Sequence, residues 1–157
     1  MDSENPVVKL CAEGMSLEAQ GHSAEAAKAF TQAWQTATDD FEASIAAHYV
    51  ARHQASPLEA LHWNQISLDR ANLVSEERVR GFYPSLYLNL GKSHEDLDHL
   101  EEAKHFYKPA EGALDVLSDD RYGNIVRDAV QRGLERLASR STPSPDKSPR
   151  PYGGSRR

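Results

Sequence analysis

Two stretches of the chain, EGMSLEAQGHSAEAAKAFTQA at residues 13–33 and LYLNLGKSHEDLDHLEEAKHFYKPA at residues 86–110, share one pattern and decide the fold. In each, a glycine is followed at the same spacing by an alanine, then an aromatic residue and then a second alanine. Small residues at such spacing let two helices cross closely, and the aromatic ring fills the gap beside them. The residues that carry the pattern are Gly14, Ala26, Phe30 and Ala33, and then Gly91, Ala103, Tyr107 and Ala110.

This spacing resembles the tetratricopeptide repeat, in which each unit forms one antiparallel helix pair. In the numbering of that repeat the glycines occupy position 8, the alanines positions 20 and 27, and the aromatic residues position 24. The resemblance covers residues 6–117 and implies an all-α fold. The expected architecture is a short right-handed superhelix of about three stacked antiparallel hairpins, followed by a C-terminal capping helix.

A weaker central copy of the repeat has His48 at position 8, one repeat length after Gly14, and Ala60 at position 20. The step from His48 to Gly91 is longer than one repeat, so an insertion lies in the linker around 73–82. A short turn of helix capped by a serine, or a kink in one longer helix, would both accommodate it.

Helical periodicity and capping residues set the expected helices, and no strand is predicted. Pro109 is expected to bend or break the helix that contains it. The expected helices cover residues 6–20, 23–37, 39–54, 57–72, 85–97, 101–117 and 121–138, with Ser23 expected as the cap of the second.

Charge divides the chain into two parts. Residues 140–157 carry five basic residues and one acidic residue, a net +4, which leaves residues 1–139 at −10. We therefore expect a helical domain at 1–139 and a flexible, basic, Pro/Ser/Gly-rich tail at 140–157. An acidic body argues against nucleic acid as a partner.

Composition also indicates where the protein is expected to be located. No stretch approaches about 18 uninterrupted apolar residues, and the opening MDSENPVV lacks the features of a secretory signal, so a cytoplasmic protein without membrane contact is expected. Cys11 is the only cysteine, which excludes an intrachain disulfide and a thiolate metal cluster within one chain.

The resemblance also implies where a partner would bind. In the family, positions 2, 5, 9, 12 and 13 of each first helix line the concave groove. Here these are Val8, Cys11, Met15, Glu18, Ala19, Glu42, Ile45, Tyr49, Arg52, His53, Ser85, Leu88, Lys92, Glu95 and Asp96.

The polar members near the middle of this groove are the candidate binding residues. Tyr49, Arg52, His53 and Lys92 could hold an anion or a carboxylate, with Asn89 close by. The clamp by which some family members hold a peptide carboxylate is absent, so chaperone tails are not expected partners. In the segment GFYPSLYLNLG the aromatic side chains are either core or binding anchors, and Tyr83 is the anchor candidate.

Three polar residues occupy the central copy where small or aromatic residues are expected: His48, Asn64 and Ser67. Buried polar groups need partners, so they should be hydrogen-bonded to one another, to water or to a ligand, and His48 and Asn64 are expected to be neighbours. This cluster is either a structural network or a polar pocket.

No metal, cofactor or catalytic residue is predicted. In HEDLDH the two histidines, His94 and His99, are five apart in sequence, which is about 140° around a helix and unsuited to one metal ion. The histidines at 48 and 53 could serve acid–base chemistry, but no nucleophile, phosphate loop or carboxylate pair accompanies them.

Two functions follow as hypotheses. The first is a non-catalytic interaction module whose groove holds a protein or peptide segment, with self-association through an open end of the array as a further expectation. The alternative is a small-molecule-binding protein or small enzyme with a pocket around His48, Arg52, His53 and Asn64.

Overall fold

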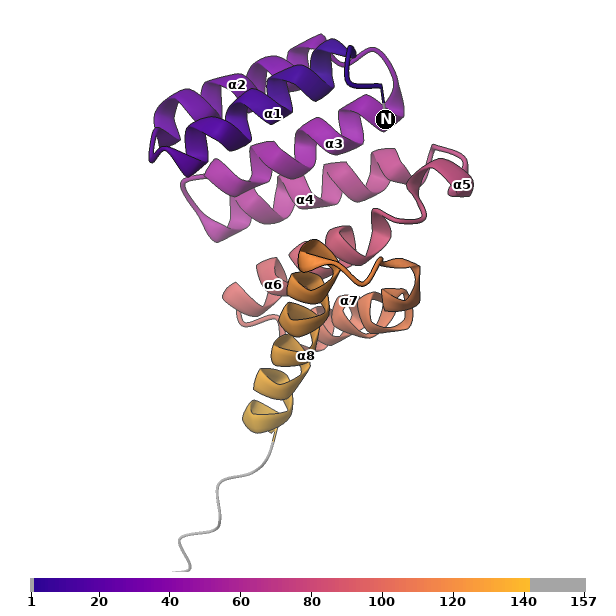
Figure 1. The fold of residues 1–157 in the computed structure, drawn as a ribbon. Helices are drawn as coiled ribbons and strands as arrows, with labels where there is room; N and C mark the ends of the chain where they lie inside the picture. Colours follow the sequence, from indigo (N-terminus) through magenta and orange to yellow (C-terminus); the bar gives the residue numbers. More distant parts are fainter. Residues whose placement is uncertain (1, 142–157) are drawn as a thin grey trace, which may run out of the picture.

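The structure is a computed structural model that describes residues 2–141, and within this range it contains eight α-helices and no strand (Figure 1). The helices are α1 Pro6–Ala19, α2 Ser23–Thr36, α3 Asp40–Val50, α4 Pro57–Ala71, α5 Glu76–Val79, α6 Tyr83–Asp96, α7 Leu100–Gly112 and α8 Arg121–Ser141, with short 3-10 helices at Ala51–His53 and Leu114–Val116. The all-α prediction is confirmed. The predicted basic tail lies outside the described residues from residue 142 onward.

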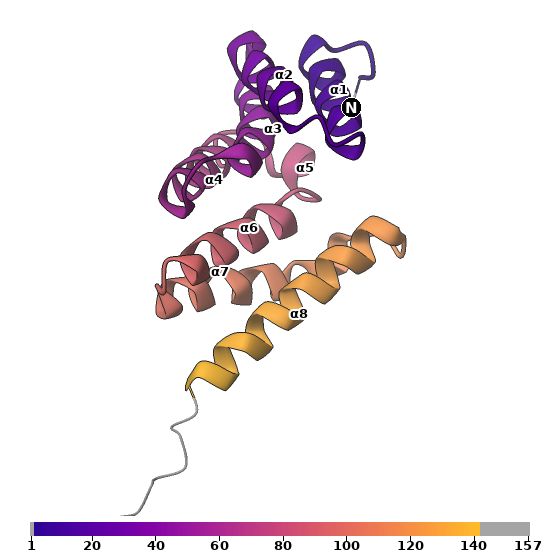
Figure 2. The same cartoon turned by 90° about the vertical axis from the view of Figure 1, so that its left-hand side faces the viewer.

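Three helix pairs form the body of the molecule, and each pair is antiparallel: α1 with α2, α3 with α4, and α6 with α7 (Figures 1 and 2). The second helix of each pair packs on the first helix of the next, so α2 contacts α3, α4 contacts α6 and α7 contacts α8. Within the described residues this is the stacked-hairpin arrangement that the sequence predicts. No described helix is both long and apolar enough to cross a membrane.

Side-chain caps explain where several helices begin. Asn5 Oδ1 accepts hydrogen bonds from the first turn of α1, Asp39 Oδ1 accepts from the first turn of α3 at 2.8 Å, and Ser56 Oγ caps α4 at 3.2 Å. At the other end of α1, Gly21 has a φ of 81°, a left-handed conformation that glycine adopts without strain. The first connection is therefore fixed by local sequence.

Three local predictions need correction. Ser23 is the first residue of α2 rather than its cap, a position that His22 occupies without a side-chain hydrogen bond. The third helix ends at Val50, and the chain continues as a 3-10 turn. The helix expected over residues 101–117 ends earlier: α7, which contains Pro109, ends at Gly112, and a 3-10 helix follows at Leu114–Val116.

The outer two pairs cross as the repeat pattern predicts. A Cβ atom on Gly14 would lie 2.3 Å from the Phe30 ring, and one on Gly91 would lie 2.8 Å from the Tyr107 ring. Neither distance leaves room for a side chain, so both glycines are required by the close approach of the helices. The four alanines of the pattern are fully buried.

The central pair crosses on serines instead. Ser44 Oγ donates to the backbone oxygen of Ser67 at 2.8 Å, and Ser67 Oγ donates to the backbone oxygen of Ser44 at 2.7 Å. These two small side chains, at positions 4 and 27 of the central repeat, link α3 to α4, and each has its hydrogen bond while buried.

The extra residues between the second and third pairs fold as α5, which acts as a spacer. Val79 on α5 is fully buried against Leu68, Leu86 and Leu90, so the insertion carries its own part of the core. With α5 in place, α4 still forms the main contact with α6, as α2 does with α3. We call this boundary between the second and third pairs the seam.

The last helix, α8, covers the end of the array. A Cβ atom on Gly133 would lie 2.6 Å from Tyr107, whose ring is therefore enclosed between Gly91 and Gly133. Val126, Val130 and other apolar residues of α8 are buried against α6 and α7. This helix has the capping role that the sequence predicts.

Candidate functional site

A cluster of charged and aromatic residues joins α1 to the end of α3. Arg52 Nη2 lies 3.0 Å from Glu18 Oε2, and His53 Nε2 lies 2.7 Å from Glu18 Oε1. Both partners belong to the 3-10 turn that ends α3, and this turn directs two consecutive side chains to one carboxylate. We call Glu18, Tyr49, Arg52 and His53 the Glu18 cluster.

Aromatic rings support the Glu18 cluster. The Phe30 ring stacks on Tyr49 with centroids 5.1 Å apart and on His53 with centroids 5.6 Å apart, and Arg52 lies over the Tyr49 ring at 5.7 Å. Burial raises the pKa of the Tyr49 hydroxyl. The structure thus brings together three of the predicted binding residues.

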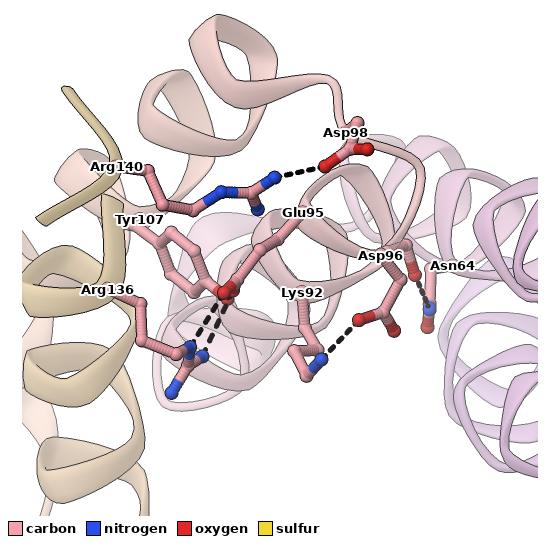
Figure 3. A network of polar contacts seen from close by, with 9 residues as sticks. Asn64, Lys92, Glu95, Asp96, Asp98, Tyr107, Arg136 and Arg140 are labelled. Carbon is pink, nitrogen blue, oxygen red and sulfur yellow. Dashed lines mark hydrogen bonds and ion pairs between the residues drawn. The ribbon is translucent and has the colours of Figure 1, made fainter. Parts of the chain in front are cut away.

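The basic residues of the predicted anion site are already paired with carboxylates of the same chain. The Arg52 guanidinium pairs with Glu18, and Lys92 on α6 pairs with Asp96 one turn further along (Figure 3). An incoming anion would have to compete with these carboxylates. The Arg52 and Lys92 side chains stay 46% and 54% exposed, so both can still reach a partner.

His48 and Asn89 meet across the seam. The amide nitrogen Nδ2 of Asn89 lies 3.2 Å from Nδ1 of His48, and the His48 ring makes edge contacts with Tyr49 and Phe82 at 5.3 and 5.0 Å. Burial, with a smaller contribution from the charge of Arg52, lowers the pKa of His48 to about 4. The ring is neutral at physiological pH and acts as a packed polar contact.

The Asn64 side chain also bonds a residue of α6. Its Nδ2 donates to Ser93 Oγ at 3.0 Å, and among the described residues its buried Oδ1 has no hydrogen-bond partner. His48 and Asn64 do not bond each other: each side chain bonds a different residue of α6. His48 and Asn64 therefore link the second helix pair to the third, rather than linking α3 to α4 within the second pair.

Tyr83 lies apart from the Glu18 cluster. Its hydroxyl donates to Asn72 Oδ1 at 2.9 Å, and its ring stacks on Tyr87 with centroids 5.5 Å apart. Both tyrosines line a separate hollow at the end of α4, together with Arg80 and Asp115.

The buried carboxylate of Glu95 is the feature that sequence reasoning missed. Tyr107 Oη donates to it at 2.6 Å, and Arg136 on α8 donates from Nε at 2.6 Å and from Nη2 at 3.0 Å (Figure 3). The hydrogen bond from Arg136 lowers the pKa of Glu95. Glu95 was expected to line the open groove, but α8 covers it, and Ser85 is buried in the same way.

The same helix adds apolar side chains beside the open part of the groove. Tyr122 hydrogen-bonds Ser85, a groove position of α6, and contributes a minor electrostatic effect to the raised pKa of Tyr49. Tyr122 and Ile125 are one turn apart on α8 and stay 53% and 57% exposed. Their exposure, on a helix that the sequence predicts to be a polar cap, has no signal in the repeat pattern.

Comparisons with known proteins agree with this architecture. No protein-family model matches the chain, and no curated protein matches it. The chain is similar to the crystal structure of the Sgt2 TPR domain from Aspergillus fumigatus, with a TM-score of 0.52 and 19% identity over 94% of this chain and 91% of that one. The fold is that of a tetratricopeptide repeat domain. The resemblance carried by the two glycine-aromatic stretches is thereby confirmed at the level of the fold.

Proposed function

We propose that the chain is a non-catalytic interaction module that binds a protein or peptide segment on its concave face. The observation that carries this proposal is that large side chains stay exposed at the groove positions: Met15 on α1, and Tyr122 on α8, which hydrogen-bonds the groove residue Ser85 and has the exposed Ile125 one turn further along. Exposed apolar side chains grouped around polar residues are typical of protein-binding surfaces.

The chemistry of this face favours an occupant with both apolar and charged groups. Tyr49 offers a ring, while Arg52, His53 and Lys92 offer donors whose present partners are carboxylates of the same chain. A partner carboxylate can exchange with Glu18 or Asp96, so charge would contribute to specificity more than to affinity. A cytoplasmic location and self-association through an end of the array are further parts of the proposal.

A peptide selection followed by matched variants tests the proposal. Peptides would be selected from a displayed random library on the full chain, and their affinities measured by fluorescence anisotropy. We expect Tyr122→Ala and Arg52→Ala to weaken binding about tenfold or more, as is typical for buried anchors at interfaces.

The controls lie on other surfaces and have the same chemistry. Leu58→Ala removes an apolar side chain that is 63% exposed on α4, and Arg132→Ala removes an exposed arginine of α8. Both should leave affinity unchanged. Equal affinities for all four variants would place the binding surface elsewhere and reject the proposal.

The second candidate is a small-molecule site at the seam, and one observation favours it: among the described residues, the buried Oδ1 of Asn64 has no partner. A ligand donor could satisfy that oxygen. Under this hypothesis, Asn64→Ala and His48→Ala abolish binding of a ligand found by screening, while the far-ultraviolet circular dichroism stays unchanged. If both variants only unfold the chain, the seam is structural.

A further inference from the structure

The turn between α6 and α7 brings two histidines together. His94 lies in the last turn of α6, which ends at Asp96, and His99 directly precedes α7. Asp98 has a φ of 60°, and the backbone N–H of His99 donates to the backbone oxygen of His94 at 2.9 Å. The expectation that these histidines lie about 140° apart on one helix is wrong, because the helix ends between them.

The imidazole nitrogens face each other in this turn. Nδ1 of His94 and Nδ1 of His99 are 3.3 Å apart, and the ring centroids are 5.5 Å apart. The His94 ring is held by Phe106, on which it stacks at 5.4 Å with an angle of 6° between the planes. One of the two rings is thus fixed by packing before any ligand arrives.

The surroundings of the pair carry acidic side chains. Glu101 and Glu102 lie in the first turn of α7, two and three residues after His99, and Glu102 interacts electrostatically with His94. Negative charge beside the two rings favours a bound cation.

The geometry points to a binding site for a divalent transition-metal ion of the zinc, copper or nickel class, with Nδ1 of His94 and Nδ1 of His99 as its protein ligands. In a tetrahedral zinc site with Zn–N bonds of about 2.0–2.1 Å, two nitrogen ligands are about 3.3–3.4 Å apart. The observed separation matches this value. In the structure the two nitrogens share a hydrogen bond, which the metal ion would replace.

This is an open site rather than a closed structural one. Within residues 2–141 no group of three or more histidine, cysteine, aspartate or glutamate side chains is placed to hold a metal ion. Water, or the Glu102 carboxylate after a side-chain rotation, would complete the coordination. Imidazole ligands select zinc, copper and nickel over magnesium and calcium, which prefer oxygen.

Metal binding would join the end of α6 to the start of α7 and so stabilise the third helix pair. A ligand that binds only the folded state raises the melting temperature, and the rise grows with ligand concentration. This inference does not depend on the proposed concave binding surface, because neither His94 nor His99 is among the residues assigned to that surface.

The test is a titration of the full chain with Zn²⁺ after dialysis against a chelator. Calorimetry should show one ion bound per chain, with a rise in melting temperature that Mg²⁺ does not produce. His94→Gln and His99→Gln should each weaken binding at least about tenfold, the loss that even removal of an outer-sphere partner causes. Long-range ¹H–¹⁵N spectra should show shifts of Nδ1, not Nε2, in both histidines.

The control variant is His22→Gln, which removes an exposed histidine at the start of α2, far along the chain from the turn. It should bind Zn²⁺ as the unmodified chain does. His99 is exposed, so its replacement tests the site without threatening the fold. Unchanged affinity in His99→Gln, or shifts confined to other histidines, would overturn the inference.

Discussion

The two halves of the molecule use the same residue at the same repeat position for opposite purposes. Glu18 and Glu95 both occupy position 12 of a first helix, and each pairs with an arginine from further along the chain. The Glu18 side chain is 18% exposed beside Tyr49, whereas Glu95 is 8% exposed beneath α8 and also binds the Tyr107 hydroxyl. One carboxylate belongs to a surface and the other to the core.

The difference comes from what covers each position. At Glu18 the arginine comes from the short 3-10 turn after α3, and among the described residues the pair stays partly exposed. At Glu95 the arginine comes from α8, which packs on both α6 and α7 and covers the carboxylate (Figure 3). A repeat position therefore does not determine whether a charged residue is available to a partner.

The largest expected effect is the difference in stability loss between a variant of Glu95 and a variant of Glu18. Glu95→Ala leaves the Arg136 guanidinium and the Tyr107 hydroxyl without their acceptor and should lower the free energy of unfolding by about 2–3 kcal/mol. Glu18→Ala removes a partly exposed pair and should cost at most about 1 kcal/mol. Urea denaturation of both variants measures the difference. Equal losses would contradict the assignment of Glu18 to the surface and Glu95 to the core.

Lowering the pH should reduce the stability of the fold in two steps, first through His48 at the seam and then through Glu95. Because His48 has a folded-state pKa of about 4 against an ordinary value near 6.5, the unfolded chain binds more protons between these values. Stability should therefore fall by about 2 kcal/mol as pH drops from 6.5 to 4. The lowered pKa of Glu95 adds a further loss below its ordinary value near 4.5.

Two variants test which residue causes each part of this pH dependence of stability. The urea midpoint of His48→Gln should stay nearly constant between pH 6.5 and 4, and that of Glu95→Gln should lose its dependence only at lower pH. A profile for His48→Gln that matches the unmodified chain would show that the seam does not exclude the charged ring.

The smallest expected effect concerns Asn64 and Ser93, the hydrogen-bonded neutral pair at the seam. Asn64→Leu alone leaves Ser93 Oγ without its donor, whereas Asn64→Leu combined with Ser93→Ala removes both partners and the buried Oδ1. The double variant should be as stable as the unmodified chain or up to about 1 kcal/mol more stable. A loss of stability, measured by thermal unfolding, would show that the pair has a bond to water or ligand that it needs.

Much of the fold follows from particular residues. Gly14 and Gly91 predict close helix crossings because no side chain fits there, and Ser56 with Pro57 predicts the start of α4. The candidate site was less predictable. Tyr49, Arg52 and His53 do come together, but the residues that neutralise or cover the groove come from α1 and α8, which no local pattern links to them.

The sequence by itself determined the helices, the close glycine-aromatic crossings and the number of stacked pairs, because spacing along one helix sets which residues share a face. Tertiary structure decided which carboxylate is buried, that His48 and Asn64 bond α6 instead of each other, and that His94 and His99 face each other across a turn. These outcomes depend on the angle at which distant helices meet and on where a helix stops. Small differences in packing energy spread over many contacts set both, so no short stretch of sequence encodes them.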